Sequence, residues 1–200
     1  MTDLTIPDGM QTLAILLMDE SGSMQRFGAA PIDAIDRWFA EQRAAPHVAT
    51  TAAAVMTFAD SLRIRIPIAP IRSARRFRGY QPDGRTRLFA SARDVFQGLR
   101  KEPRLRGTLP GRVVIAVFTD GKDNCSSEHS VQVLRRLSAD ARADGWTLLT
   151  FGFGVDARAI ARSMGFPHDD AHAQTLEATA ASLHRAVEYS SRVTSRPVSS

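Results

Sequence analysis

Residues 11–24 read QTLAILLMDESGSM, a nearly continuous apolar run that ends in acidic residues, two serines and a glycine. Apolar runs of this kind are typical of strands buried on both faces of a parallel sheet. The chain thus leaves a predicted buried strand and at once presents Asp19, Ser21 and Ser23. A simple capping loop has a similar composition, because Ser, Asp and Gly are common at such positions. The stretch alone leaves two interpretations open, a capping loop or a binding site.

Four further segments have the character of strands. Residues 112–120 (RVVIAVFTD) and 146–154 (WTLLTFGFG) are apolar runs, and 51–59 (TAAAVMTFA) is weaker because alanine is a poor strand former. Residues 62–71 alternate apolar side chains with arginines and prolines, which predicts a half-exposed strand at a sheet edge. The tight connection from the preceding strand predicts that these two pair antiparallel.

Helical periodicity fills the gaps between the strands, and a weak signal near 171–174 allows one more short strand. Five helices are predicted, around Ile32, Ile35 and Phe39; around Phe89, Ala92, Phe96 and Leu99; around Val131, Leu134 and Leu137; over 156–164; and along Leu176, Ala180, Leu183 and Val187. Strands that alternate with helices predict a doubly wound, Rossmann-like α/β fold. We expect a mostly parallel sheet with one antiparallel edge strand and helices on both faces.

The chain reads as one domain of 200 residues, with an N-terminal extension at 1–10, the domain at 11–190 and a disordered tail at 191–200. The first ten residues lack the pattern of a signal peptide, and the apolar runs fall short of the roughly 18 residues of a membrane helix. Cys125 is the only cysteine, so no intramolecular disulfide can form. These features predict a soluble cytoplasmic protein without membrane contact.

The formal net charge is +5, and arginine carries nearly all of the positive charge. Codon bias in a GC-rich genome explains such a composition, and so does an acidic partner. Nucleic acid is a weaker candidate because no nucleic-acid motif accompanies the charge. One group of arginines gathers before and around Thr86: Arg72, Arg75, Arg76, Arg78, Arg85 and Arg87. The group is either an ordinary solvated surface or a surface that steers an acidic partner.

Two predicted strands end in an aspartate, Asp19 in the first and Asp120 in the segment 112–120. Ligands of open α/β sheets bind beyond the carboxyl ends of the strands, so neighbouring strands would place both carboxylates on one rim. The loop hydroxyls of Ser21 and Ser23 would add to them. Such hard oxygen ligands favour Mg²⁺ or Mn²⁺ over zinc or copper.

The pattern Asp-x-Ser-x-Ser after a buried strand, with a later strand ending in Thr-Asp-Gly at 119–121, resembles the von Willebrand factor A (VWA) domain. That family has a metal-ion-dependent adhesion site (MIDAS), which adds a threonine from a distant loop. QPDGRTRLFASA offers Thr86, two residues after Gly84. The resemblance covers roughly 11–190 and implies a complete metal site made of Asp19, Ser21, Ser23, Thr86 and Asp120.

The resemblance implies a Mg²⁺- or Mn²⁺-dependent interaction module, not an enzyme. The metal would bind a Glu or Asp carboxylate of a protein partner, with the three hydroxyls and two aspartates as its protein ligands. Stand-alone bacterial proteins of this type accompany ATPases, kinases, phosphatases or stress-response systems, which predicts an intracellular adaptor. One departure from the family pattern is Arg85, where relatives often carry a small residue.

Other interpretations remain at this stage. Asp19 would serve as nucleophile in a Mg²⁺-dependent phosphatase, although Ser21 stands where the second aspartate of that chemistry belongs. A metal-independent scaffold of the same fold is a further alternative. Glu20 is expected to be exposed beside the metal, with no ligand role. Asp123 and Asn124 form either a plain turn or a support that orients the metal loop.

Overall fold

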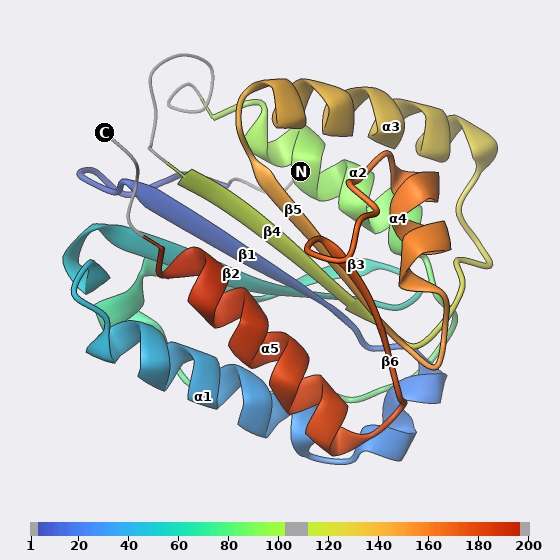
Figure 1. The fold of residues 1–200 in the computed structure, drawn as a ribbon, viewed down its shortest axis with the longest axis horizontal. Coiled ribbons are helices and arrows are strands. Elements are labelled where there is room, and N and C mark those ends of the chain that lie inside the picture. The colour runs from blue at the N-terminus through green and yellow to red at the C-terminus, as the bar shows by residue number, and fades with distance from the viewer. Residues whose placement is uncertain (1–3, 103–111, 197–200) are drawn as a thin grey trace.

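A six-stranded sheet between two layers of helices makes up residues 4–102 and 112–196, the part of the chain that the computed structural model describes (Figure 1). The strands are β1 (Thr12–Asp19), β2 (Thr51–Phe58), β3 (Leu62–Pro70), β4 (Arg112–Thr119), β5 (Thr147–Phe153) and β6 (Ala173–Leu176). The helices are α1 (Ala30–Ala44), α2 (Leu88–Leu99), α3 (Glu128–Ala143), α4 (Ala157–Met164) and α5 (Ala180–Thr194). Short 3₁₀ segments are η1 (Gly22–Phe27), η2 (Val48–Thr50) and η3 (Ile71–Ser73).

The strand order is β3-β2-β1-β4-β5-β6, and every pair is parallel except β2 with β3. The predicted doubly wound sheet with one antiparallel edge strand is therefore confirmed. The order reverses at β1 and β4, which is the switch point where open α/β sheets bind ligands. Met18 pairs with Phe118, so the loops after Asp19 and after Thr119 leave the sheet side by side.

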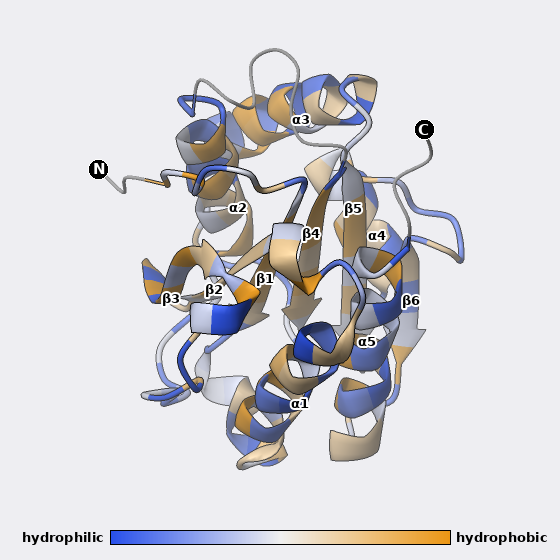
Figure 2. Cartoon of the chain, turned by 90° about the vertical axis from the view of Figure 1, so that its left-hand side faces the viewer, coloured by the Kyte–Doolittle hydropathy of each residue, from blue (hydrophilic) through white to orange (hydrophobic). Residues whose placement is uncertain are grey.

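Two apolar clusters hold the helices on the sheet. One joins α2, α3 and α4 to one face, and the other joins α1 and α5 to the opposite face (Figure 1). All eight residues of β1 are buried, and its side chains alternate between the clusters, as a central strand requires. β2 is an alanine-rich strand in spite of low propensity, because burial between β1 and β3 overrides it. Figure 2 shows the central strands in pale and tan colours and hydrophilic blue stripes along the helices.

The edge strand β3 departs from its predicted alternation. Ile66 packs in the α1–α5 cluster, whereas Leu62, Ile64 and Ile68 lie against the other cluster. The cause is two shifts in register. Met56 pairs with Ile64 and Val55 with Ile66, so Arg65 is an extra residue, and a second shift lies between Val55 and Ala53, which pairs with Ala69. Bulges of this kind re-aim side chains near functional sites.

Two boundaries near the C-terminus differ from expectation. Leu176 does not belong to the last helix, because it lies in β6 and pairs with Phe153. The last helix begins after Thr179, whose side chain accepts a hydrogen bond from Ser182 N, and it continues to Thr194. It therefore includes the first residues of the predicted tail, while residues 197–200 lie outside the described part.

The N-terminal segment also departs from the picture of a simple extension. Leu4 and Ile6 are buried in the cluster that holds α2, α3 and α4, so this segment contributes to the core. Residues 1–3 lie outside the described part. Within residues 4–102 and 112–196, no helix has both the length and the apolar character that crossing a membrane requires.

Candidate functional site

Asp19 lies at the carboxyl end of β1 and is completely buried. Its Oδ2 accepts a hydrogen bond from Thr119 Oγ1 at 2.6 Å, and its Oδ1 accepts one from the backbone N–H of Ser21 at 2.8 Å. Both donors are electrically neutral. Burial raises the pKa of Asp19 to about 6, although these hydrogen bonds act in the opposite direction. The ionised carboxylate is thus in a place where a nearby cation would stabilise it.

Asp120 follows β4 and lies at the same edge of the sheet as Asp19. We call this edge, formed by the carboxyl ends of β1 and β4 and the loops that follow them, the rim. Its Oδ1 accepts a hydrogen bond from Ser23 Oγ at 2.5 Å, and Ser23 Oγ lies 3.2 Å from Ser21 Oγ. Asp120 and Ser21 are buried, whereas Ser23 is exposed. The two serines therefore connect the two carboxylates, Ser23 through its hydroxyl to Asp120 and Ser21 through its backbone N–H to Asp19. The exposed Ser23 lies on the side of the group that faces solvent.

Thr86 lies in the loop between β3 and α2. The surroundings of Gly121 show that Thr86 lies close to the other predicted ligands. A Cβ atom built on Gly121 would lie 3.2 Å from Thr86 Oγ1 and 3.9 Å from Ser23 Oγ. Two hydroxyls thus face one point beside Asp120. The structure brings together at this rim all five residues predicted from the sequence.

The loop after β4 holds Thr86 in place. Thr86 N donates to Asn124 Oδ1 at 3.1 Å, and Asn124 N donates to Thr86 O at 3.0 Å. Asp123 Oδ2 accepts from Phe89 N at 2.7 Å and so caps the start of α2, where Arg87 provides no side-chain cap. Of the two interpretations left open for Asp123 and Asn124, the structure favours the supporting role, because both side chains fix the segment that carries Thr86.

Glu20 is the main correction to the sequence-based view of the site. It is completely buried instead of exposed, and Arg65 donates a hydrogen bond to its Oε1. Gln81 N donates to the same oxygen at 2.6 Å, and Arg63 Nη1 lies 3.7 Å from Oε2. Glu20 O also accepts from Asp83 N at 2.9 Å. Glu20 therefore anchors the 80–84 loop that leads to Thr86.

A tyrosine joins the two sides of the rim. Tyr80 OH donates to the backbone oxygen of Asp19 at 2.7 Å, and the bond is buried. Gly22 N donates to Gly84 O at 3.1 Å, which ties the serine loop to the same segment. Gly84 has a φ of +77°, and a Cβ atom there would lie 2.2 Å from Asp60 Oδ2. Glycine is thus required where this loop turns toward Thr86.

Arg26 is a member of the rim that sequence reasoning missed. Its Nε and Nη2 donate to Asp120 Oδ2 at 2.9 and 2.5 Å. The Arg26 side chain is 48% exposed, whereas that of Asp120 is fully buried. No sequence motif identifies Arg26, because its contact with Asp120 depends on how η1 packs near the end of β4.

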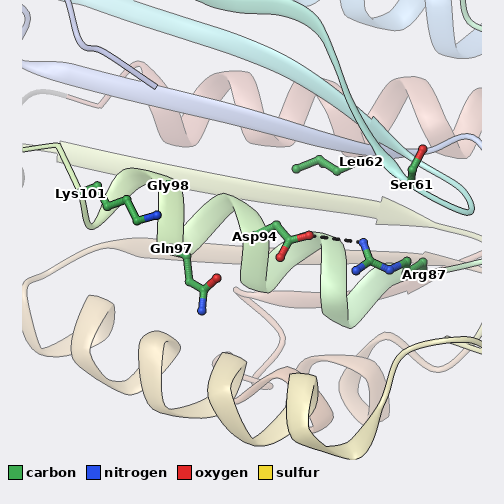
Figure 3. A pocket seen from close by; sticks show the side chains of 7 residues that line it. All are labelled: Ser61, Leu62, Arg87, Asp94, Gln97, Gly98 and Lys101. Atoms are coloured by element: carbon green, nitrogen blue, oxygen red, sulfur yellow. Dashed lines mark hydrogen bonds and ion pairs between the residues drawn. The ribbon is translucent and has the colours of Figure 1, made fainter. Parts of the chain in front are cut away.

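The predicted arginine group divides in the structure. Arg72, Arg75, Arg76, Arg78 and Arg85 are exposed, and Arg85 lies beside the rim, with its Nε 3.5 Å from Asp60 Oδ1. Arg87 is half-buried, and its Nη1 lies 3.3 Å from Asp94 Oδ2. Figure 3 shows this pair in a hollow of about 350 Å³ between α2 and the start of β3. None of the five rim residues lines it.

The donor set decides which ion would fit. Within residues 4–102 and 112–196, no group of three or more His, Cys, Asp or Glu side chains is placed to hold a metal. Two carboxylates and three hydroxyls supply only hard oxygen atoms, which suit Mg²⁺ or Mn²⁺. The residues present at the rim therefore fit a divalent cation of this class.

No protein-family model matches the sequence, and no curated protein matches it. Solved structures do match. The pilus adhesin SpaC from Lactobacillus rhamnosus GG in its open conformation has a TM-score of 0.70 and 11% identity, over 95% of this chain and 30% of the adhesin. The VWA domain of SpRpn10 has a TM-score of 0.59 and 14% identity, over 89% of this chain and 94% of that domain. This chain has a VWA-like fold.

A third match is relevant to the metal. The structure of proximal thread matrix protein 1 from the mussel byssus with a zinc-occupied MIDAS motif has a TM-score of 0.62 and 14% identity, over 90% of this chain. This chain spans about half of the mussel protein and less than a third of the adhesin structure. At these identities the likeness shows the VWA-like fold alone.

Proposed function

We propose that this chain is an interaction module that binds a divalent cation, Mg²⁺ or Mn²⁺, through Asp19, Ser21, Ser23, Thr86 and Asp120. The observation that carries the proposal is the environment of Asp19, a fully buried carboxylate whose hydrogen-bond donors are neutral. Burying a charge is costly unless it is paired or coordinates a metal. Three hydroxyls and a second carboxylate lie next to it. The zinc-occupied MIDAS motif of the mussel protein supports a divalent metal at such a site, without a preference for Mg²⁺ or Mn²⁺.

We further propose that the module binds a Glu or Asp carboxylate of a protein partner. A bound Mg²⁺ keeps exchangeable positions that an outside carboxylate can take. The rim opens to solvent at Ser23, and the exposed Arg85 beside it would favour an acidic partner. An intracellular bacterial adaptor that works with an ATPase, kinase, phosphatase or stress-response system is the role that we propose.

The geometry gives less support to a phosphatase. A carboxylate nucleophile must reach its substrate, but both oxygens of Asp19 are hydrogen-bonded and the side chain is buried. Ser21 lies where that chemistry needs a second acid. We therefore propose a binding function without catalysis. A scaffold that needs no metal is the less favoured alternative, because it leaves the burial of Asp19 without a compensating charge.

The proposal is tested with this chain as bait in a pull-down from a lysate, in Mg²⁺ and in EDTA, alongside Thr86→Ala. The matched control is Thr50→Ala, because the Thr50 hydroxyl donates to His47 O near the opposite end of β2. Circular dichroism establishes that each variant is folded. We expect a protein that wild type and Thr50→Ala retain in Mg²⁺, and that EDTA and Thr86→Ala both release. Equal retention under all conditions would contradict the metal-dependent function.

A further inference from the structure

Arg26 has a position that the five-residue site does not explain. Two of its nitrogens, Nε and Nη2, donate to a single oxygen of Asp120, Oδ2. The other oxygen of Asp120, Oδ1, accepts from Ser23. Within the described part of the chain, the side-chain hydrogen bonds of Arg26 go to Asp120 alone. Asp120 therefore has a cation on one side and the predicted metal ligands on the other.

This arrangement differs from that of Asp19. Asp19 accepts hydrogen bonds from a hydroxyl and a backbone N–H, whereas Asp120 has a guanidinium in direct contact. Charge-assisted pairs of this type are stronger than hydrogen bonds between neutral groups. One of the two negative charges of the rim is thus already balanced by the protein.

We propose that Arg26 is a built-in counter-charge of the metal site, which lowers the affinity for a divalent cation and keeps the loaded site positive. The proposal rests on the proposed function. With Arg26, the two carboxylates and a divalent ion leave one positive charge, which an acidic partner would neutralise. Without Arg26, the same two carboxylates and ion are already neutral. Arg26 would therefore make the site favour a negatively charged ligand, by the usual rule of complementary charge.

The chain offers a matched control for this idea. Arg85 also lies beside the rim and is more exposed than Arg26, at 70% against 48%. It pairs with Asp60, which is not one of the five residues. Removal of Arg85 changes the net charge of the protein by the same amount as removal of Arg26, but it leaves the pair of Asp120 and Arg26 in place.

The experiment is calorimetric titration of the metal-free full chain with Mn²⁺ alone, for wild type, Arg26→Gln, Arg26→Lys, Arg85→Gln and Thr86→Ala. We expect Arg26→Gln to bind Mn²⁺ about tenfold more tightly than wild type, as Coulomb repulsion between a divalent ion and a neighbouring unit charge gives in a water-like medium. Arg26→Lys should stay nearer to wild type because it keeps the charge. Arg85→Gln should change the affinity by no more than about twofold, because exposed charges are screened.

The outcomes separate this proposal from the proposed function. If wild type binds Mn²⁺ and Arg26→Gln binds it equally or more weakly, Arg26 only orients Asp120 and the counter-charge proposal is wrong. If Arg85→Gln gains as much affinity as Arg26→Gln, the effect is one of general surface charge and the proposal also fails. If neither wild type nor Arg26→Gln binds Mn²⁺ any better than Thr86→Ala does, the metal-dependent function itself fails. Thermal unfolding in EDTA shows that each variant is folded.

Discussion

Asp19 and Glu20 are consecutive acidic residues at the end of β1, and both are completely buried. They differ in the groups that bind their carboxylates. Glu20 turns toward β3, where Arg65 and the backbone N–H of Gln81 bind its Oε1. Asp19 turns toward β4, where Thr119 Oγ1 and Ser21 N are its donors. One carboxylate is paired with a cation of the protein, and the other is not.

This difference distinguishes a carboxylate that stabilises the fold from a carboxylate that binds a ligand. A buried charge with its own counter-ion is electrostatically compensated, as Glu20 is by Arg65, and removing one partner of such a pair is costly. A buried carboxylate with neutral donors still lacks a compensating charge, and burial raises its pKa, to about 6 for Asp19. Glu20 therefore has a structural role: it holds the loop that carries Thr86 in place beside the rim. The Asp19 side is where an outside cation would be bound.

The largest effect is expected from Glu20→Gln, which keeps the shape of the side chain but removes its charge. Arg65, whose side chain is 19% exposed, would lose its counter-ion at the end of the sheet. We expect a loss of about 3–5 kcal/mol in the free energy of unfolding, as for other broken buried pairs. Urea unfolding of the metal-free protein measures it.

Glu188→Gln is the control for that variant, because the Glu188–Arg192 ion pair has similar chemistry on the exposed face of α5. Surface pairs contribute about 0–1 kcal/mol, so this variant should resemble wild type. A similar small loss for Glu20→Gln would mean that the Glu20–Arg65 pair does not support the rim.

A smaller effect is expected from Tyr80→Phe, which removes the bond between the two sides of the rim. The backbone oxygen of Asp19 would lose a buried donor at 2.7 Å. We expect a loss of about 1–2 kcal/mol in the free energy of unfolding, since an unsatisfied buried acceptor carries a penalty of this order. Tyr189→Phe is the control, because Tyr189 OH makes the same kind of bond to Ala171 O at an exposed position. Equal losses in the two variants would show that Tyr80 has no special role.

The smallest effect on the metal-free protein is expected from Asp19→Asn, the same change of acid to amide one residue from Glu20. It removes a buried charge that has no cationic partner, so the free energy of unfolding should change by about 1 kcal/mol or less. Urea unfolding in EDTA, next to Glu20→Gln, makes the comparison direct. Losses of the same size would contradict the distinction between the two carboxylates.

The features of the fold and of the site that depend on local pattern could be predicted from the sequence. The apolar runs of β1 and β4 identify central strands, and their ends place Asp19 and Asp120 on one rim. These features follow from hydrophobicity and strand ends, which short stretches of sequence carry. Thr86, in a loop far along the chain, was identified through the resemblance to the VWA domain and not from local pattern.

The features that depend on contacts between distant segments could not be predicted from the sequence. Glu20 is buried because a bulge in β3 turns Arg65 toward it, and an alternating pattern gives no sign of a bulge. Leu176 fits the helical stripe by periodicity, but its pairing with Phe153 places it in a strand. The contact of Arg26 with Asp120 likewise joins residues 94 positions apart. Tertiary packing decides such details over local preference.

Binding of a divalent cation by Asp19 is tested by the thermal unfolding of wild type and Asp19→Asn, each in EDTA and in excess Mg²⁺. A ligand at 100 times its Kd stabilises the folded state by about 2.7 kcal/mol. For a chain of this size that corresponds to a rise in Tm of about 5–10 °C. We expect this rise in wild type and none in Asp19→Asn. An unchanged Tm in wild type, or the same rise in both proteins, would contradict the claim that Asp19 binds a divalent cation.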